Sequence, residues 1–276
     1  ALMAEIKITF LGTGAGNCVY RNHTAIVLEC SDGTRLLLDG SSGNSLLRQG
    51  AAVGFLPEDY DQILVTHDHA DHIGGLPFLQ GQRTLVSPDG PPLRVYSTEE
   101  SLDAVRILCE ATRMRSITVD KEGAKDHEGR PVFQWLPIIA GHAVELGPST
   151  HATCFTVDHV DGAVGWRIEC GGISVVFSGD TRFSENLVNA SMGADLLIHE
   201  ALTTGKDGDS AWNRLHSSSA EAARAAATAG VKQLVMTHID SGLHDNTQPL
   251  IDDAGKYFNG TISVAHDLYQ LSVSSS

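Results

Sequence analysis

The sequence predicts an α/β fold in which two β-sheets pack face to face and helices cover their outer sides. Short apolar, strand-like runs recur along the whole chain, and helical stretches are interspersed among them instead of being gathered at one end. Such a mixture favours packed sheets with outer helices. The 276 residues contain no internal repeat and no low-complexity linker. We therefore expect a single domain over residues 1–276.

The expected strands are runs of aliphatic and β-branched residues bounded by turn residues. In chain order they cover residues 6–11, 25–29, 35–38, 62–65, 93–96, 132–136, 154–157, 164–169, 174–177, 196–198, 233–236 and 261–264.

Three segments have the composition of helices, and they cover residues 101–112, 185–190 and 217–229. The last is the clearest, because it begins with a run of serines that can cap the helix, is rich in alanine and stops at Gly230. Three other segments are expected to lie outside the regular elements. They are residues 1–3 as an expression remnant, residues 121–129 as a surface hairpin or loop, and residues 272–276 as a Ser-rich tail.

Composition and cysteine usage indicate a soluble globular protein of the cytoplasm. No apolar stretch approaches the roughly 20 residues that a membrane helix needs. The five cysteines are scattered and never form a C-x-x-C pair, which favours free thiols in a reducing compartment, although Cys154 and Cys170 on neighbouring strands leave one disulfide open. The formal net charge of −15 repels polyanions, so we expect no nucleic-acid partner.

A dense set of metal-ligand side chains follows the apolar run that ends at Val65. His67 and His69 project to one side of an extended segment, because side chains at i and i+2 share a face. Asp71 and His72 follow where the chain turns into a helix and point at the same space. Imidazole and carboxylate together suit zinc or a similar divalent ion. With Asp68 the run offers five potential ligands, more than one tetrahedral ion can use, which favours two adjacent metals and a hydrolase.

Further acids and histidines follow later apolar strands, at the edge where α/β sheets gather their active sites. They are Asp158 and His159, Asp180, His199 and Glu200, and His238. His266 is an alternative to His238, because it also follows a strand-like run.

On these residues the sequence resembles the metallo-β-lactamase superfamily over nearly the whole chain. The residues 67–72 fit the family's H-x-H-x-D-H signature. The resemblance implies a four-layer αββα sandwich and two Zn²⁺ per chain, with Mn²⁺ as the alternative. It implies one metal on His67, His69 and His159, and the other on Asp71, His72 and His238. Asp180 and a hydroxide would bridge both metals, with Asp71 doubling as proton acceptor.

A closer resemblance is to the ribonuclease Z-like branch of that superfamily. Residues 11–16 with Arg21-Asn22 resemble its N-terminal glycine loop, and residues 179–182 resemble its GDTR segment. His199-Glu200-Ala201 and His216-Ser217-Ser218 are similar to its HEA(T) and HST stretches. In that branch the Glu and the HST histidine protonate the leaving oxygen, a role that falls here on Glu200 and His216. A helix-capping or loop hydrogen bond is the structural alternative for both.

The sequence departs from the tRNA-processing members of this branch. Those members carry a long arm between the histidine and the aspartate that correspond to His159 and Asp180, and the short spacing here leaves no room for it. Together with the charge of −15 this disfavours tRNA processing. An extra structural zinc found in one small-substrate relative is not expected, because only Cys18 lies in the corresponding region.

The predicted activity is hydrolysis of phosphodiester bonds in small substrates. The alternatives are an aryl or alkyl sulfatase, then a lactonase or β-lactamase, then a ribonuclease Z-type nuclease. A lactamase would need an exposed hydrophobic loop over the metals, for which residues 40–54 are the candidate, and a nuclease would need a basic, aromatic-lined face. A non-catalytic scaffold is disfavoured because no ligand is missing.

The expected partner is a small ester, with no membrane, and the resemblance implies a homodimer. Pocket walls are expected from residues 80–92, 113–148 and 203–212, with Trp212 and Arg214 as candidate lining residues.

Overall fold

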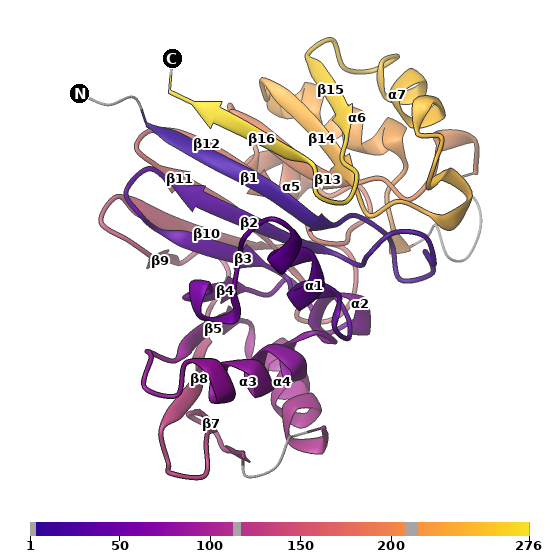
Figure 1. The fold of residues 1–276 in the computed structure, drawn as a ribbon. Coiled ribbons are helices and arrows are strands. Elements are labelled where there is room, and N and C mark those ends of the chain that lie inside the picture. The colour runs from indigo at the N-terminus through magenta and orange to yellow at the C-terminus, as the bar shows by residue number, and fades with distance from the viewer. Residues whose placement is uncertain (1–3, 113–116, 208–214, 276) are drawn as a thin grey trace.

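The computed structural model describes residues 4–112, 117–207 and 215–275. In this part of the chain, two mixed β-sheets pack against each other and helices cover their outer faces (Figure 1). The four layers are those of the predicted αββα sandwich.

The larger sheet has the order β16-β1-β2-β3-β4-β5-β8-β7-β6. Its strands are β1 (Glu5–Gly12), β2 (Ala25–Cys30), β3 (Arg35–Leu38), β4 (Gln62–Leu64), β5 (Leu93–Ser97), β6 (Thr118–Val119), β7 (Gly123–Lys125), β8 (Pro131–Pro137) and β16 (Gln270–Ser274). Strands β3, β4, β5 and β8 run parallel to one another.

The smaller sheet has the order β15-β14-β13-β12-β11-β10-β9. Its strands are β9 (Ala143–Glu145), β10 (Thr150–Thr156), β11 (Val164–Cys170), β12 (Ile173–Phe177), β13 (Leu196–Glu200), β14 (Gln233–Thr237) and β15 (Thr261–Val264). Strands β12 to β15 are parallel, so their carboxyl ends share one edge of the sheet.

The helices are α1 (Ser45–Ala52), α2 (Ala70–Ile73), α3 (Leu76–Val86), α4 (Glu99–Ala111), α5 (Glu185–Ala190), α6 (Ser219–Ala229) and α7 (Gln248–Ala254). Short 3₁₀ turns lie at Pro57–Asp59, Gly205–Asp207 and Ser241–Leu243. The N-terminus of α6 is the predicted one: Ser218 and Glu221 form a reciprocal capping box, and Gly230 ends the helix in the left-handed conformation.

Three apolar clusters hold the layers together. The central one lies between the sheets and contains Ile8, Leu28 and Trp166. A second joins the larger sheet to α1, α3 and α4, and a third joins the smaller sheet to α5, α6 and α7. The loops after β4, β12, β13 and β14 are thus anchored on strands that are buried on both faces.

Three segments differ from the sequence predictions. Residues 121–129 do not all lie outside the regular elements, because Gly123–Lys125 form β7, whose Ala124 is buried in the core. The predicted tail at residues 272–276 is wrong over residues 272–274, because these belong to β16, which pairs antiparallel with β1 from Glu5↔Ser274 onward. Residues 40–54 are not a loop over the metals: they contain α1, whose Leu46 is fully buried in the core. The residues 1–3 lie outside the described residues.

All five cysteines are buried and free. Cys154 and Cys170 do lie on the neighbouring strands β10 and β11, but they face Trp166 and Thr150 and not each other. Within the described residues, no helix combines the length and the apolar character needed to span a membrane.

Candidate metal centre

The His-rich loop follows β4 and is held by a buried carboxylate from the neighbouring strand. Asp39 directly follows β3 and is completely buried. Its Oδ1 accepts a hydrogen bond from the Thr66 backbone N–H (2.8 Å), and its Oδ2 accepts one from Thr66 Oγ1 (2.8 Å). The same Oδ2 lies 2.7 Å from His72 Nδ1. Because Asp39 occupies Nδ1 of His72, Nε2 is the atom that faces the other site residues.

Asp39 is a site residue that the sequence reasoning missed. The signal was available, since Asp39 follows the apolar run Leu36-Leu37-Leu38 just as the other candidate residues follow their strands. Its backbone φ is 55°, in the left-handed region that a residue with a side chain seldom adopts.

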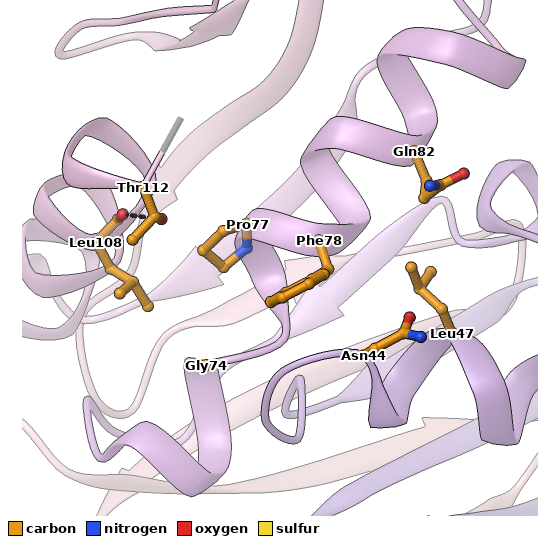
Figure 2. A pocket seen from close by; sticks show the side chains of 8 residues that line it. All are labelled: Asn44, Leu47, Gly74, Pro77, Phe78, Gln82, Leu108 and Thr112. Atoms are coloured by element: carbon orange, nitrogen blue, oxygen red, sulfur yellow. Dashed lines mark hydrogen bonds between the residues drawn. The ribbon is translucent and has the colours of Figure 1, made fainter. Parts of the chain in front are cut away.

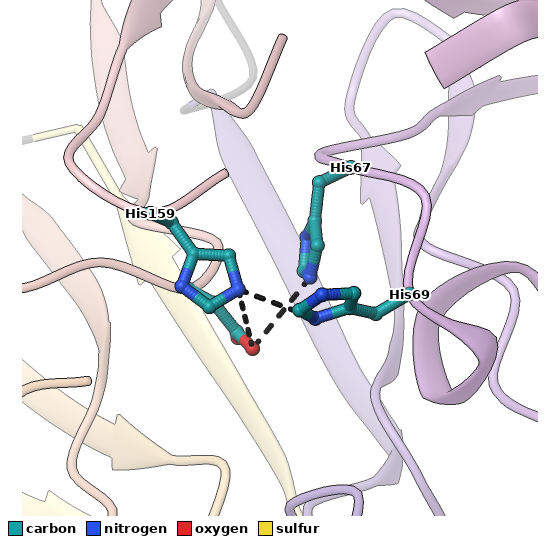
Figure 3. A group of neighbouring side chains, drawn as sticks. His67, His69 and His159 are labelled. Carbon is teal, nitrogen blue, oxygen red and sulfur yellow. Dashed lines mark hydrogen bonds and ion pairs between the residues drawn. The ribbon is translucent and has the colours of Figure 1, made fainter. Parts of the chain in front are cut away.

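The first group of ligand atoms contains three imidazoles and one carboxylate. Figure 3 shows His67 and His69, from the loop after β4, converging with His159, from the loop after β10. The ligand atoms of these histidines and of Asp180 all lie within 4.8 Å of one another. His159 Nε2 is 3.2 Å from His69 Nδ1, and His67 Nε2 is 3.7 Å from Asp180 Oδ2.

The second group contains two imidazoles and two carboxylates: Asp71, His72, Asp180 and His238. Oδ2 of Asp180 lies 3.3 Å from His72 Nε2 and 3.2 Å from His238 Nε2. Asp71 Oδ2 lies 3.4 Å and 3.3 Å from the same two nitrogens. The structure therefore brings all seven predicted metal ligands together, in two groups that share Asp180.

Parallel strands deliver the second half of the site. Asp180, Glu200 and His238 come at the carboxyl ends of β12, β13 and β14. Gly179 before Asp180 has a φ of 59°, and a Cβ there would lie 2.9 Å from Cβ of Thr66, so glycine lets the two loops touch. His238 has the same φ of 59° without being glycine.

Several buried polar atoms of the two groups lack hydrogen-bond partners among the described residues. They include His67 Nε2, His72 Nε2 and Asp180 Oδ2. Orphaned buried atoms are rare because each one costs free energy. Imidazole nitrogens and carboxylate oxygens that face one another without hydrogen bonds are typical of a site that binds a cation between them. The donor set therefore fits divalent metal ions.

Burial and neighbouring charges set the pKa values in the cluster. Burial lowers the pKa of His67 well below its usual value and that of His159 to about 4, so both are neutral at pH 7, as metal ligands must be. Burial would raise the pKa of Asp180, but His238 and His72 more than offset it, and the carboxyl stays ionised. Burial opposes protonation of His72, yet Asp180 holds its pKa well above normal. A cation would displace that proton.

Glu200 and His216 form a buried pair beside the second group. Glu200 Oε1 lies 3.1 Å from His216 Nδ1 and accepts a hydrogen bond from the Thr181 backbone N–H (2.6 Å). Burial would lower the pKa of His216, but Glu200 and then Asp180 raise it to about 9. Burial raises the pKa of Glu200. The pair therefore shares a proton at neutral pH, with Nδ1 of His216 turned to Glu200.

Other candidates lie away from the site. His266 belongs to neither ligand group; its Nδ1 contacts the backbone oxygen of Asp267 (2.9 Å). His127 and His142 are exposed and belong to neither ligand group. Trp212 and Arg214 lie outside the described residues.

A cavity of about 560 Å³ lies between α1, α3 and α4 (Figure 2). Its lining is mainly apolar and includes Leu47, Phe78 and Leu108. No predicted ligand lines it, and Gly74, which follows α2, is its link to the metal-ligand loop. The cavity is thus beside the candidate centre and not part of it.

The chain is similar to known proteins over most of its length. The model of the beta-lactamase superfamily domain matches residues 34–239. A curated protein named Ribonuclease Z from Bacillus licheniformis is 29% identical over 313 aligned positions, covering 96% of this chain and 98% of the relative.

Two solved structures share the fold. The metallo-beta-lactamase fold protein YhfI from Bacillus subtilis superposes with a TM-score of 0.79 at 22% identity, covering 98% of this chain and 100% of that one. A diphosphatase from the PhnP family superposes with a TM-score of 0.70 at 19% identity, covering 96% and 97%.

Proposed function

Since the chain belongs to the metallo-β-lactamase superfamily of hydrolases, we propose that it cleaves phosphodiester bonds of small substrates at a centre of two divalent cations, Zn²⁺ or Mn²⁺. The observation that carries the proposal is the pair of ligand groups that share Asp180, with buried atoms left unbonded in both. A phosphodiester needs such a centre most, because the attacked group is already anionic.

The protein residues have separate roles in this proposal. His67, His69 and His159 would hold one cation, and Asp71, His72 and His238 the other, with Asp180 between them. Bound cations supply Lewis acidity and lower the pKa of water. Asp71 accepts the proton of the attacking water.

His216 supplies the proton for the leaving oxygen. Its Nδ1 is engaged by Glu200 at 3.1 Å, so the proton must leave from Nε2. Because the pKa of His216 is about 9, the acid is in its protonated form at pH 7.

The substrate class rests on size and charge. The alignment with the ribonuclease relative runs over 313 positions, more than the 276 residues of this chain, so the relative contains segments that this chain lacks. In this chain Asp180 follows His159 by only 21 positions, and the net charge is −15. Both features support a small substrate over a folded RNA.

A ribonuclease Z-type nuclease is the second candidate, because the curated relatives bear that name. A sulfatase uses the same site with a different ester. A lactamase is the least supported, because α1 occupies the segment that would have to form its hydrophobic loop.

The test is metal analysis combined with a panel of p-nitrophenyl esters: the bis-phosphate, the monophosphate, the sulfate and the acetate, with a chromogenic lactam and a tRNA precursor. We expect about two metals per chain and the highest kcat/KM on the bis-phosphate. One metal or fewer would contradict the paired centre. A higher kcat/KM on the sulfate or on the tRNA precursor would show that the substrate is a sulfate ester or an RNA and not a small phosphodiester.

His216→Ala tests the general acid. We expect it to reduce kcat on alkyl phosphodiesters by about 10²–10⁴-fold, and much less on p-nitrophenyl diesters, whose leaving phenolate needs no proton. Equal losses on both substrates would contradict the role of His216.

A further inference from the structure

An apolar loop tip stands beside the second ligand group. Val19 and Tyr20 are 80% and 66% exposed, in a loop that follows β1. A Cβ on Gly16 of that loop would lie 3.1 Å from Asp71 Oδ2. The Ala15 backbone N–H donates to the backbone oxygen of Ile239, the neighbour of His238 (3.1 Å). The loop therefore borders the ligands Asp71 and His238.

Hydrogen bonds and a ring contact hold the tip of this loop in place. The Val19 backbone N–H donates to Ser241 Oγ (3.1 Å), and Asn17 Nδ2 donates to Asp240 Oδ2 (2.7 Å). The ring of Tyr20 stacks on His244 with centroids 4.0 Å apart. The loop backbone and the Tyr20 ring are thus held in place while the side chains of Val19 and Tyr20 stay exposed, which leaves both accessible to a bound substrate.

A second exposed apolar side chain follows the shared ligand Asp180 in the sequence. Phe183 is 40% exposed and lies three residues after Asp180. The segment before it is fixed to the segment before His159, because the Arg182 backbone N–H donates to the backbone oxygen of Asp158 (3.0 Å). Exposed apolar side chains therefore occur on two of the loops that carry or border the ligands.

The arginines of these two loops are already engaged. Arg21 donates to the backbone oxygens of His244 (2.7 Å) and Ala265 (2.7 Å). Arg182 pairs with Asp158 at 2.8 Å. Arg21 is therefore held by backbone oxygens, and Arg182 lies in a half-exposed ion pair.

We infer that the substrate is a phosphodiester with two apolar or aromatic ester groups, one contacting Val19 and Tyr20 and the other contacting Phe183. This rests on the proposed function and names its substrate class. The single negative phosphate lies at the ligand groups, and each ester group extends over one apolar neighbour. Preordered apolar contacts add affinity because little side-chain entropy is lost on binding.

Binding to the Zn²⁺-loaded protein tests the inference without requiring turnover. Diphenyl phosphate and dimethyl phosphate carry the same charge and differ only in their ester groups. Titration calorimetry is expected to show that the diphenyl ester binds at least about tenfold more tightly. Val19→Ser, Tyr20→Ser and Phe183→Ser should each reduce that ratio by about threefold or more.

Met192→Ser is the matched control. Met192 is 56% exposed and precedes β13, at the edge of the sheet opposite to the ligands, so the ratio should not change. Equal affinity for the two esters, or a ratio that survives the three variants, would overturn the inference. The inference would also be overturned if light scattering showed that the variants dissociate a dimer while the affinity ratio stays the same. The apolar residues would then form an interface between two copies of the chain.

Hydrolysis of bis(p-nitrophenyl) phosphate separates this inference from the proposed function. A protein that prefers diphenyl phosphate but does not hydrolyse the bis-phosphate would keep the binding surface and lose the proposed activity. A protein that hydrolyses the bis-phosphate without a binding preference would keep the proposed activity and lose the inferred contacts with the ester groups.

Discussion

The two ends of the sandwich hold similar side chains and use them differently. At the carboxyl edge, two groups of histidines and aspartates have ligand atoms within 4.8 Å of one another. At the opposite end lies a third group of ligand atoms, also within 4.8 Å of one another, from Cys30, Asp32 and Cys170. There the carboxylate of Asp32 accepts hydrogen bonds from the Ser149 N–H (2.8 Å) and Thr150 Oγ1 (2.8 Å), and so ties the two sheets together.

The difference lies in hydrogen bonding and not in proximity. Both carboxylate oxygens of Asp32 have donors, and burial raises the pKa of the Cys30 thiol to about 12, which keeps it protonated. Asp180 Oδ2 and His67 Nε2 have no hydrogen-bond partner among the described residues. Close packing of ligand atoms is therefore common to both clusters, whereas ligand atoms without a hydrogen bond occur in the candidate centre and not on the Asp32 carboxylate. Four predictions test this contrast.

Asp180→Ala should have the largest effect. Losing the shared carboxylate should lower metal content and reduce kcat/KM on bis(p-nitrophenyl) phosphate by on the order of a thousandfold or more. Metal analysis and steady-state kinetics on the same sample measure both effects, and wild-type metal content in the variant would contradict the role of Asp180 as a shared ligand.

Asp39→Asn should weaken metal binding by about 10–100-fold, because the amide no longer orients His72 as a carboxylate does. Competition with a chromogenic chelator gives the affinity. Asp32→Asn is the matched control at the other end and should leave the affinity unchanged; equal losses in both variants would remove the distinction between the two ends.

Asp32→Ala should do the opposite of Asp180→Ala. We expect it to lower the free energy of unfolding by about 1–3 kcal/mol through lost hydrogen bonds between the sheets, while metal content and kcat/KM stay at the wild-type level. Urea unfolding and metal analysis on the same sample would expose any effect on the centre.

The pH dependence of the Asp32 contribution should be the smallest effect. Burial would raise the pKa of Asp32, but hydrogen bonds from Thr34 and Ser149 hold it below its usual value. The stabilisation is therefore fully present above the unfolded carboxyl pKa of about 3.9 and is lost as the pH falls below it. The stability gap between the metal-free wild type and Asp32→Asn should shrink from pH 6 to pH 3. A gap that widened on acidification would contradict the sign.

The strands and most of the metal ligands could be predicted from the sequence by the same signal, a continuous apolar run followed by a polar residue. Strands buried on both faces are continuous apolar runs, and such runs mark where the next polar residue emerges. Asp180 and His238 were found by this rule, and the same rule would have found Asp39. The choice of His238 over His266 depended on the family resemblance, since both follow apolar runs.

Other elements have weak local signals. Helix α3 contains Gly81 and Pro77, and its apolar side chains Leu76 and Leu79 gain stability only by packing on the larger sheet. Strand β16 alternates Leu271 and Val273 with polar residues, a strand pattern that the abundance of serine concealed. The pairing of Glu200 with His216 came from the family resemblance alone.

The origin of the ligands in both sheets has a consequence for folding. The loop after β4 supplies four ligands from the larger sheet, and the other three come from the smaller sheet. Asp71 and His238 are 167 positions apart in sequence and 3.3 Å apart in space. Contacts of such separation form late, after the costly closure of long loops. We therefore expect metal uptake during refolding to report the docking of the two sheets and to lag behind the formation of each sheet.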